Sequence, residues 1–452
     1  MALTLTRPSW QAVKRGMVSD SSLIIWLMIF QNLMRIVSSV TLTRLLNAEA
    51  FAVVAVITSI SVTLGLVSDI GISAFLVRHE RTVENDFRNE VWTLRLVRGI
   101  TLSLVTFIIA IPAADFLDKP DLYLVIAVAG LWSVLDGLGS LAPMVALRNR
   151  KLRKLTAIDI GSQVFGILIS IALAAWLRSY WAIIISNMVG QVMGIVFSYI
   201  LYDNSGHRWR FSRERASELW RFSRFITGST ILTLIITQSD KLILTKALPL
   251  ETLGLYVIAA GLAATPVSMV ASYAARITYP LLAQVRREAP ETLGYQYYHH
   301  RIVPTLFFAF AAGGLVGFAP AVIDILYDPR YASAGLFLRI MSISSFFSMG
   351  NYAANELMIV LGRTRFTLFT NVIRLTYLLA GGAIGWYLKG PLGIVWAVGT
   401  VEVVAQIFGW FALRRLGLLS IRWETIILAT GAAGVATGYF ADQLGRLVLG
   451  IH

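Results

Sequence analysis

The sequence predicts an all-α integral membrane protein built from two six-helix lobes, related by a parallel repeat, with an extra helix at the C-terminus. Hydrophobic residues make up 57% of the 452-residue chain and charged residues only 14%, whereas soluble proteins have roughly 45–50% and about 25%. Because a membrane helix needs about 20 mostly apolar residues, the chain can form about a dozen spans with short connections. This leaves no room for a large soluble domain.

Apolar runs separated by polar breaks predict the individual spans. The N-terminal half contains such runs at 22–43, 50–77, 91–113, 122–147, 157–177 and 180–201. The C-terminal half contains them at 224–246, 254–282, 302–323, 335–361, 366–388 and 391–413. A further run at 424–440, rich in Gly and Ala, predicts the extra helix. The first run is too long for a signal peptide and lacks a small-residue cleavage site, so we expect it to be retained.

These spans divide the chain into five segments. They are a cytoplasmic N-terminal segment at 1–21, an N-terminal lobe at 22–201, a cytoplasmic linker at 202–223, a C-terminal lobe at 224–413, and an extra span with a tail at 414–452. Within the linker, Leu219 and Trp220 stand among several arginines. This pattern is typical of an amphipathic helix that lies at the membrane interface and joins the two lobes.

The distribution of charge predicts the orientation in the membrane. Most of the 39 Lys and Arg residues fall on the side of the N-terminus, with clusters at 14–15, 148–154, 208–224, 286–287, 363–365 and 414–415. The opposite loops are short and tend to be acidic, as at Asp115, Asp118 and Asp121. The positive-inside rule therefore places the N-terminus in the cytoplasm. Anionic membrane lipids account for the net charge of +14, so we expect them as partners and expect no nucleic acid.

Two segments of the chain resemble one another. The stretch LTRLLNAEAFA from Leu42 aligns with LTKALPLETLG from Leu244, which matches a threonine, a cation and a glutamate in register. Similar capping residues at two unrelated helix ends would be the alternative explanation. Because six predicted spans separate the copies, both run in the same direction through the bilayer. Parallel repeats of this kind occur in alternating-access transporters, with the binding site near the midplane between the halves.

Several kinds of chemistry are excluded by composition. The chain has no cysteine, and its five histidines include no HExxH-type pair. It therefore has no disulfide, thiolate nucleophile or Cys-ligated metal, and we expect no catalytic residue, metal or cofactor. Transport is a better hypothesis than catalysis.

Five segments, in order along the chain, resemble motifs of one transporter family. They are RLLNAEAFA after the first span, SDIGISAFLVR with Asp69 and Gly71, LAPMVALRNRKLRKL after the fourth span, DKLILTKALPLETLGLY in the seventh, and TPVSMVASYAARITYPLLAQ in the eighth. Ala52 stands where this family usually has glycine, and Leu155 where phenylalanine is common. Over roughly residues 20 to 415 the chain resembles the polysaccharide transporter family, the lipid-linked oligosaccharide flippases of the multidrug/oligosaccharidyl-lipid/polysaccharide (MOP) superfamily.

The resemblance implies a bacterial cytoplasmic (inner) membrane protein whose cargo is a polyprenyl-pyrophosphate oligosaccharide, moved toward the periplasmic leaflet for export of a cell-surface polysaccharide. We expect a monomer, with other polysaccharide-assembly membrane proteins as further partners. One alternative is a cation-coupled multidrug exporter of the same superfamily. Another, from a different class, is a polyprenyl-dependent glycosyltransferase or polymerase, but no predicted outer loop is long enough to carry its catalytic groups.

Cations inside the predicted spans are candidates for the substrate site, because a charge at membrane depth costs about 2.5–3.5 kcal/mol on insertion scales. Arg35 shares one helix face with Gln31 and Asn32, at i−4 and i−3. Arg374 lies well inside its span, one turn from Asn371. Lys241 adjoins Asp240, but neighbours on a helix point about 100° apart, so we expect each to have its own target. Arg35, Lys241 and Arg374 would line a cavity between the lobes and attract pyrophosphate. Alternatively, they pair with acids and hold the lobes together.

Four acids inside the predicted spans are candidates for ion coupling. They are Asp136, Asp240, Glu356 and Glu402. A buried carboxylate is either neutral or matched by a cation, so these groups would carry protons or Na⁺ driven by a gradient. Ion pairs with the arginines named above are the alternative.

Overall fold

The computed structural model describes residues 30–68, 72, 75–76, 79, 84–148, 152–202, 205–363 and 365–449. The predicted segment 1–21 and the motif with Asp69 and Gly71 lie outside these residues. Among the residues described, all regular elements are helical. This confirms the predicted all-α class.

The N-terminal helices follow the predicted spans closely. They are a helix at 30–45, α2 (Ala48–Val67), α4 (Asn85–Phe116), α5 (Tyr123–Ala129), α6 (Leu131–Leu138), α7 (Ala142–Arg148), α8 (Leu152–Leu177) and α9 (Trp181–Ile200). The single helix predicted over 122–147 is wrong, because the chain is extended at Gly139 (φ −59°, ψ 144°) and this residue separates α6 from α7. The shorter segment Pro120–Leu138 is by itself long and apolar enough to span a membrane.

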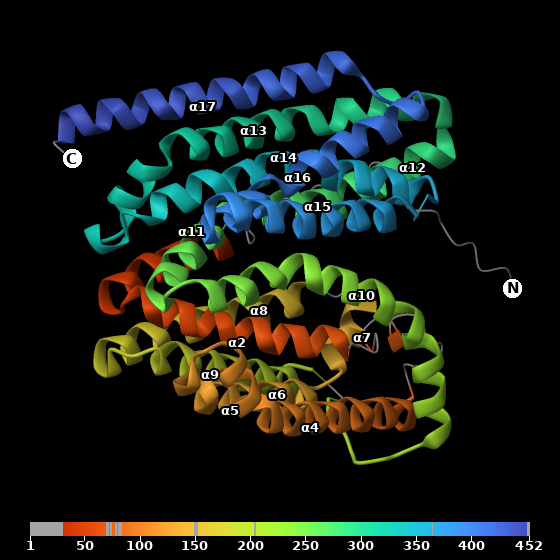
Figure 1. Cartoon of the computed structure of the whole chain (residues 1–452). Helices are drawn as coiled ribbons and strands as arrows, with labels where there is room; N and C mark the ends of the chain where they lie inside the picture. Colours follow the sequence, from red (N-terminus) through yellow and green to blue (C-terminus); the bar gives the residue numbers. More distant parts are fainter. Residues whose placement is uncertain are drawn as a thin grey trace, which may run out of the picture.

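The C-terminal helices also agree with the predicted spans. They are α10 (Arg213–Ala247), α11 (Leu250–Tyr273), α12 (Tyr279–Glu288), α13 (Leu293–Leu326), α14 (Ala334–Val360), α15 (Arg365–Lys389), α16 (Pro391–Arg415) and α17 (Ile421–Leu449). A π-helical turn, η3 (Ala274–Thr278), joins α11 to α12. The predicted interfacial helix is continuous with the following span in α10, which bends in Figure 1.

Nine helices in the described part of the chain are long and apolar enough to cross a membrane. Large apolar side chains cover the outside of the molecule, where Trp176 is 80% exposed and Tyr387 is 89% exposed. Such a surface is stable in hydrocarbon but not in water. The chain is therefore a multi-pass membrane protein.

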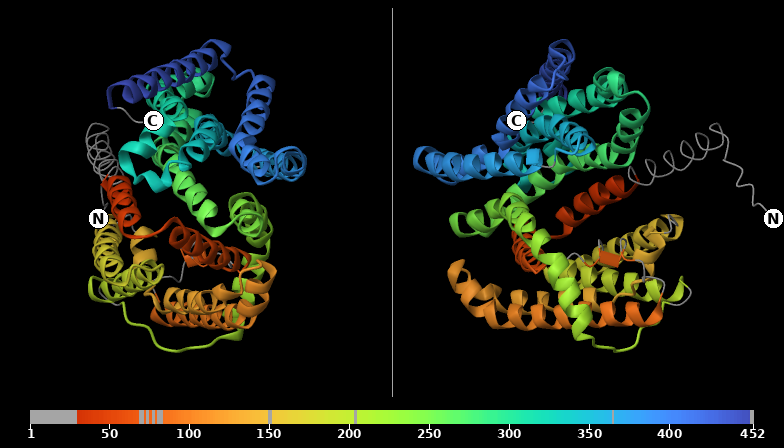
Figure 2. Two further views of the ribbon diagram at one scale, coloured as in Figure 1. Left: turned by 60° about the vertical axis from the view of Figure 1, so that its left-hand side comes forward. Right: turned by 90° about the vertical axis from the view of Figure 1, so that its right-hand side faces the viewer.

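The helices form two groups with a shared core. Figures 1 and 2 show the helices up to α9 in one group and those from α11 in the other, with α10 beside α2 at the boundary. Completely buried residues of this core include Val56, Ile57, Tyr256, Leu338 and Val395, from α2, α11, α14 and α16. A repeat relation between the two groups stays a prediction.

The two segments that resemble one another in sequence form similar local structures. Each ends one helix, at residue 45 or at Ala247, and begins the next within a few residues, at Ala48 or at Leu250. The two following helices, α2 and α11, pack against one another. At their closest approach a Cβ atom on Gly254 would lie 1.9 Å from the carbonyl oxygen of Ala48, so this position accepts only glycine.

Helix α17 packs along α13 through small residues, which explains its Gly- and Ala-rich sequence. A Cβ atom on Gly313 would lie 2.2 Å from the carbonyl oxygen of Gly431, and one on Gly317 would lie 2.3 Å from that of Val435. Helices in membranes associate through such close backbone contact because lipid provides no hydrophobic driving force between them. The extra helix thus belongs to the C-terminal group.

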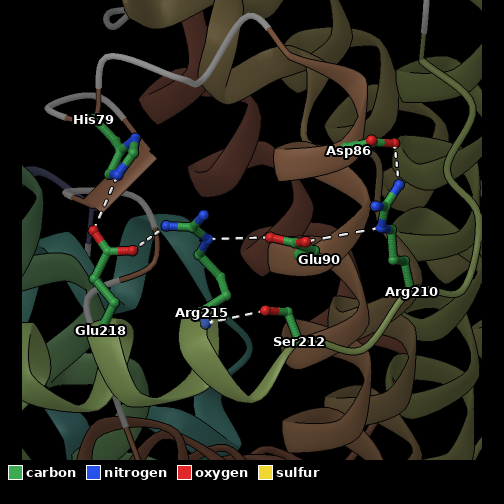
Figure 3. A network of polar contacts seen from close by, with 7 residues as sticks. All are labelled: His79, Asp86, Glu90, Arg210, Ser212, Arg215 and Glu218. Atoms are coloured by element: carbon green, nitrogen blue, oxygen red, sulfur yellow. Dashed lines mark hydrogen bonds and ion pairs between the residues drawn. The ribbon is translucent and has the colours of Figure 1, made fainter.

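An ion-pair network attaches the linker and the first turns of α10 to α4 (Figure 3). It contains His79, Asp86, Glu90, Arg210, Ser212, Arg215 and Glu218. The buried Arg215 contacts Glu90 at 3.2 Å and also pairs with Glu218, which in turn contacts His79 at 3.0 Å. The network fixes the linker against the end of the bundle that carries the basic loops.

Within the linker, His207 is held as a neutral hydrogen-bond acceptor. Its Nε2 atom accepts from the main-chain N–H of Leu141 at 3.1 Å, and its ring stacks on Trp92 with 5.7 Å between centroids. Burial, together with the positive charges of Arg88 and Arg95, lowers the pKa of His207 from 6.5 to about 4.

Candidate functional site

A polar cavity of about 890 Å³ lies between the two groups of helices. Its walls come from the helix at 30–45 and from α2, α8, α9, α10, α11 and α14. Its charged and amide side chains are Arg35, Gln163, Asn187, Gln238, Asp240 and Lys241. The structure therefore brings together two of the three cations predicted to form the site.

Arg35 is an exposed guanidinium in this cavity. It forms no hydrogen bond or ion pair with any residue that the structure describes. An arginine inside a membrane helix is costly unless a counter-charge or water offsets it. Its fork of N–H donors suits a phosphate or carboxylate oxygen pair, so the cavity offers an anion a ready partner.

Lys241 and Asp240 also line the cavity, but they contact each other. The Lys241 Nζ atom lies 3.4 Å from Asp240 Oδ1 and donates to the carbonyl oxygen of Thr237 at 3.1 Å. The two neighbours thus contact each other, contrary to expectation, because the long lysine side chain reaches back along the helix surface. Each also has the separate partner that was expected, Thr237 for Lys241 and Tyr256 for Asp240. The other carboxylate oxygen accepts from the Tyr256 hydroxyl at 2.5 Å. Lys241 is thus partly neutralised, whereas Arg35 is not.

Several hydroxyl groups also line the cavity, although most of its surface is apolar. The cavity is lined by Ser38, Ser39, Thr58, Ser59, Ser162, Ser170 and Ser186. The Oγ atoms of Ser59, Ser162 and Ser170 have no hydrogen-bond partner within the described part of the chain. Unpaired buried hydroxyls cost free energy unless a ligand or water satisfies them. This surface suits a cargo that carries many hydroxyl groups.

Sequence reasoning missed the contribution of α8 and α9. Gln163 and Asn187 lie in these apolar spans and face the cavity. They could have been found by the criterion that was applied to Arg35, since each is an amide inside a membrane helix. The sequence analysis considered only charged residues in this half and the amides next to Arg35, so it left out Gln163 and Asn187.

The predicted polar face around Arg35 divides in the structure. Asn32 is 9% exposed, and its Oδ1 atom accepts from the Ser268 hydroxyl of α11 at 3.5 Å. The main-chain oxygen of Gln31 accepts from Gln163 Nε2 at 3.5 Å. Neither residue lines the cavity as Arg35 does. Both instead support the helix at 30–45 against its neighbours.

Arg374 is not among the residues that line this cavity. It forms an ion pair with Glu402 of α16 at 2.6 Å and donates to Asn371 at 3.3 Å. Asn351 of α14 donates to the same Glu402 carboxylate at 2.6 Å. This is the ion-pair alternative considered above, and it ties α14, α15 and α16 together. A direct role of Arg374 and Asn371 in binding stays a prediction.

The remaining candidate acids also differ in their surroundings. Asp136 pairs with Arg95 at 2.8 Å. Glu356 of α14 is half-buried and makes no ion pair or hydrogen bond with the described residues. No group of three or more His, Asp or Glu side chains in that part of the chain could hold a metal ion. Among the four predicted acids, only Glu356 therefore lacks a partner in the described structure.

Two hydroxyl contacts join the two groups of helices beside the cavity, which Ser39 also lines. The Tyr331 hydroxyl, which is buried, donates to the carbonyl oxygen of Leu46 at 2.7 Å. The hydroxyls of Tyr327 and Ser39 lie 3.2 Å apart. The turn from α13 to α14 and the turn before α2, which carry Tyr331 and Leu46, lie at the left-hand end in Figure 1, opposite the basic loops. We call the two hydroxyl contacts the tyrosine closure.

Solved structures with a similar fold are transporters and a flippase. One is the lipid II flippase MurJ in an inward closed conformation, with a TM-score of 0.71, 11% identity, and coverage of 94% of this chain and all of that one. Another is an inward-facing multidrug transporter of the MATE family of the MOP superfamily, with a TM-score of 0.65, 15% identity, and coverage of 86% and 95%. At these identities the likeness shows the fold.

Two curated relatives are named for the biosynthesis of succinoglycan and of lipopolysaccharide. The succinoglycan biosynthesis transport protein ExoT of Rhizobium meliloti (strain 1021) is 25% identical over 310 residues, which cover 67% of this chain and 61% of that protein. The lipopolysaccharide biosynthesis protein WzxC of Escherichia coli (strain K12) is 19% identical over 386 residues, which cover 84% and 77%.

The match to a known family spans more than half of the chain. Residues 41–335 match the family described as polysaccharide biosynthesis protein. This match confirms the resemblance to a polysaccharide family that the sequence motifs indicated. The chain therefore belongs to the polysaccharide biosynthesis protein family.

Proposed function

We propose that this protein is a flippase that moves a polyprenyl-pyrophosphate-linked oligosaccharide across the bacterial cytoplasmic membrane by alternating access. The observation that carries the proposal is the position of Arg35, a guanidinium without a partner among the described residues, in a cavity between the two groups of helices. Two cations and one carboxylate among the lining residues leave this cavity with net positive charge. A phosphorylated cargo offsets that charge.

The sugar part of the cargo would occupy the same cavity. Side-chain amides and hydroxyls line it, and several of these hydroxyls have no protein partner among the described residues. An oligosaccharide supplies hydrogen-bond donors and acceptors for such groups, while the hydrocarbon tail stays in the lipid. No covalent bond is made or broken, which agrees with a relative named as a transport protein and with neighbours named as transporters and a flippase.

Alternating access needs a cavity that is closed at one end at a time. In the proposed cycle the tyrosine closure would form the closed end, opposite the basic loops. We infer from the positive-inside rule that the basic end faces the cytoplasm, which would make this an inward-oriented state. Cargo would then enter from the cytoplasmic leaflet and leave after the closure opens.

The multidrug exporter is the second hypothesis within transport. A cation-coupled exporter of cationic drugs would favour acids in its cavity, whereas the single lining carboxylate here already contacts Lys241 and Tyr256. The net positive charge of the cavity therefore supports an anionic cargo.

Replacement of Arg35 tests the proposal. Because a hydrogen bond to a charged group contributes about 1.5–3 kcal/mol, the Arg35→Ala variant should lower glycan export at least about tenfold. Export is measured as surface polysaccharide in a deletion strain that carries each variant, with membrane abundance determined in parallel. Arg44→Ala is the matched control, because Arg44 is exposed near the end of the same helix and does not line the cavity. Normal export by Arg35→Ala at normal abundance would refute the role of Arg35.

Ion coupling is a separate part of the proposal. Glu356 is the candidate carrier of H⁺ or Na⁺, since each of the other three acids contacts a cation. Transport into vesicles should respond to an imposed Na⁺ or H⁺ gradient, and the response should be lost in Glu356→Gln. Indifference of the wild-type protein to both gradients would remove the coupling hypothesis without affecting the role of Arg35.

A further inference from the structure

A second cavity lies away from the central one, where α14, α15 and α16 meet at the basic end of the bundle. Its volume is about 860 Å³, close to that of the central cavity. It is lined by residues from the turn after α14, the first turns of α15 and the last turns of α16. We call it the arginine groove. Neither the proposed transport path nor any predicted site residue involves it.

The floor and walls of the arginine groove are aromatic. Phe366 is 8% exposed and stacks on Phe408, with 5.5 Å between ring centroids and 10° between planes. Phe369 and Phe411 line the groove as well, and they are 55% and 49% exposed. A surface of this kind is unfavourable in water and suits a hydrocarbon chain.

Three arginines form the rim of the groove. Arg363, Arg365 and Arg415 all line it, and none of them forms an ion pair or a side-chain hydrogen bond with a residue that the structure describes. The Arg415 guanidinium lies over the Phe411 ring, 4.3 Å from its centroid. Cationic groups thus stand directly beside the exposed aromatic surface.

Local backbone structure fixes the position of this rim. Gly362 has a positive φ of 73°, and the N–H of Arg363 donates to the carbonyl oxygen of Met358 at 2.8 Å. This is the hydrogen-bond pattern by which a glycine ends a helix. The turn places Arg363 beside Arg365, where α15 begins and where the helix dipole adds positive potential.

We propose that the arginine groove binds an anionic phospholipid from the leaflet at the basic end of the bundle. The phosphate would lie among the three guanidiniums, and an acyl chain would lie along the phenylalanines. Charge complementarity favours an anionic headgroup, because the groove is lined by three arginines and by no acid. The aromatic floor and the volume favour an amphiphile over a free phosphate ion.

Binding is tested with the purified full-length protein in detergent. Phosphatidylglycerol, phosphatidylcholine and inorganic phosphate are titrated separately, and bound lipid is counted by native mass spectrometry while thermal unfolding is followed. Phosphatidylglycerol should bind saturably and raise the unfolding temperature, because a ligand specific for the folded state stabilises it. Phosphatidylcholine and inorganic phosphate should have little effect. Equal effects of the two lipids, or equal protection by phosphate alone, would overturn the proposal.

Substitutions locate the binding site. The R363Q/R365Q/R415Q variant should bind phosphatidylglycerol at least about tenfold more weakly, since each basic residue near an anionic lipid contributes to attraction. R286Q/R287Q is the matched control, because this exposed pair lies at the same end and does not line the groove. Wild-type binding by the triple variant, or an equal loss in the control, would overturn the assignment.

A second variant separates the lipid chain from the charge. F369A keeps every arginine and removes an exposed aromatic ring, so it should weaken phosphatidylglycerol binding while the protein stays folded. The proposal fails if F369A binds as tightly as the wild-type protein. Arg35→Ala should bind this lipid normally, because Arg35 lies in the other cavity, so the groove is tested independently of transport.

Discussion

Replacing Glu424 should detach α17 from the rest of the bundle. Glu424 is 7% exposed and forms an ion pair with Arg301 of α13, which is 2% exposed. The same carboxylate accepts from the Tyr298 hydroxyl and from the Trp410 indole N–H, each at 3.0 Å. In Glu424→Gln the guanidinium of Arg301 would remain buried without its counter-charge. The NH₂ group of the new amide would also face N–H and O–H donors that now bind the carboxylate.

The expected cost follows from the burial of the pair. Removing one partner of a buried ion pair costs about 3–5 kcal/mol, because the remaining charge is left uncompensated. We expect the unfolding temperature in detergent to fall by about 5–10 °C, somewhat less per kcal/mol than for a small domain. Unfolding is followed by tryptophan fluorescence of the purified variant. The control is Glu288→Gln, since Glu288 is exposed and contacts only Gln284; it should change stability by less than about 0.5 kcal/mol.

A double variant identifies the origin of the effect. Arg301→Leu combined with Glu424→Leu removes both charges, and such apolar replacements are often neutral or stabilising. The double variant should therefore be more stable than Glu424→Gln. If Glu424→Gln unfolds at the wild-type temperature, or if the double variant is the less stable of the two, the ion pair does not hold α17 in place.

Two further outcomes follow from the packing and from the linker. Gly254→Val should reduce membrane abundance sharply, because the valine side chain would collide with Ala48 where α2 and α11 meet. The control Gly65→Ala should be tolerated, because a Cβ atom there meets nothing within 4 Å. Equal abundance of the two variants would contradict the close contact at Gly254. The pKa of His207 is lowered from 6.5 to about 4, so between these values the unfolded chain binds more protons. The contribution of His207 to the free energy of unfolding should be complete above about pH 6.5 and should be lost as the pH falls toward 4. Thermal unfolding across this range should show the decline in the wild-type protein, and a decline of equal size in His207→Gln would rule out His207 as its source.

The sequence could predict the spans because hydrophobicity is a property of each helix alone. The run at 180–201 corresponds almost residue for residue to α9, and the run at 157–177 ends with α8, which begins five residues earlier. The break at Gly139 was not predicted in this way, because the run stays mostly apolar on both sides of it and the freed N–H of Leu141 is bonded by His207, which is distant in the sequence. The extra helix was predicted from composition, but its reason, close contact with α13, depends on tertiary structure.

The site could be predicted only in part, for a related reason. Arg35 and Lys241 were found because charges in membrane spans are conspicuous, and both line the cavity. Arg374 was conspicuous for the same reason, yet its partner Glu402 lies on another helix. Whether a charged side chain faces a cavity or a neighbouring acid depends on how its helix is rotated about its axis. A single sequence carries little information about that rotation.

The tyrosine closure bears on the free energy that opening requires in the proposed transport cycle. Its two hydroxyl contacts, Tyr331 to Leu46 and Tyr327 to Ser39, contribute a net of about 0.5–1.5 kcal/mol each. A bias of about 5.5 kcal/mol reverses a two-state population from 1:99 to 99:1. Breaking both contacts therefore requires about 1–3 kcal/mol, which is less than such a bias. The hydroxyl contacts alone are too weak to lock the proposed cycle in this state.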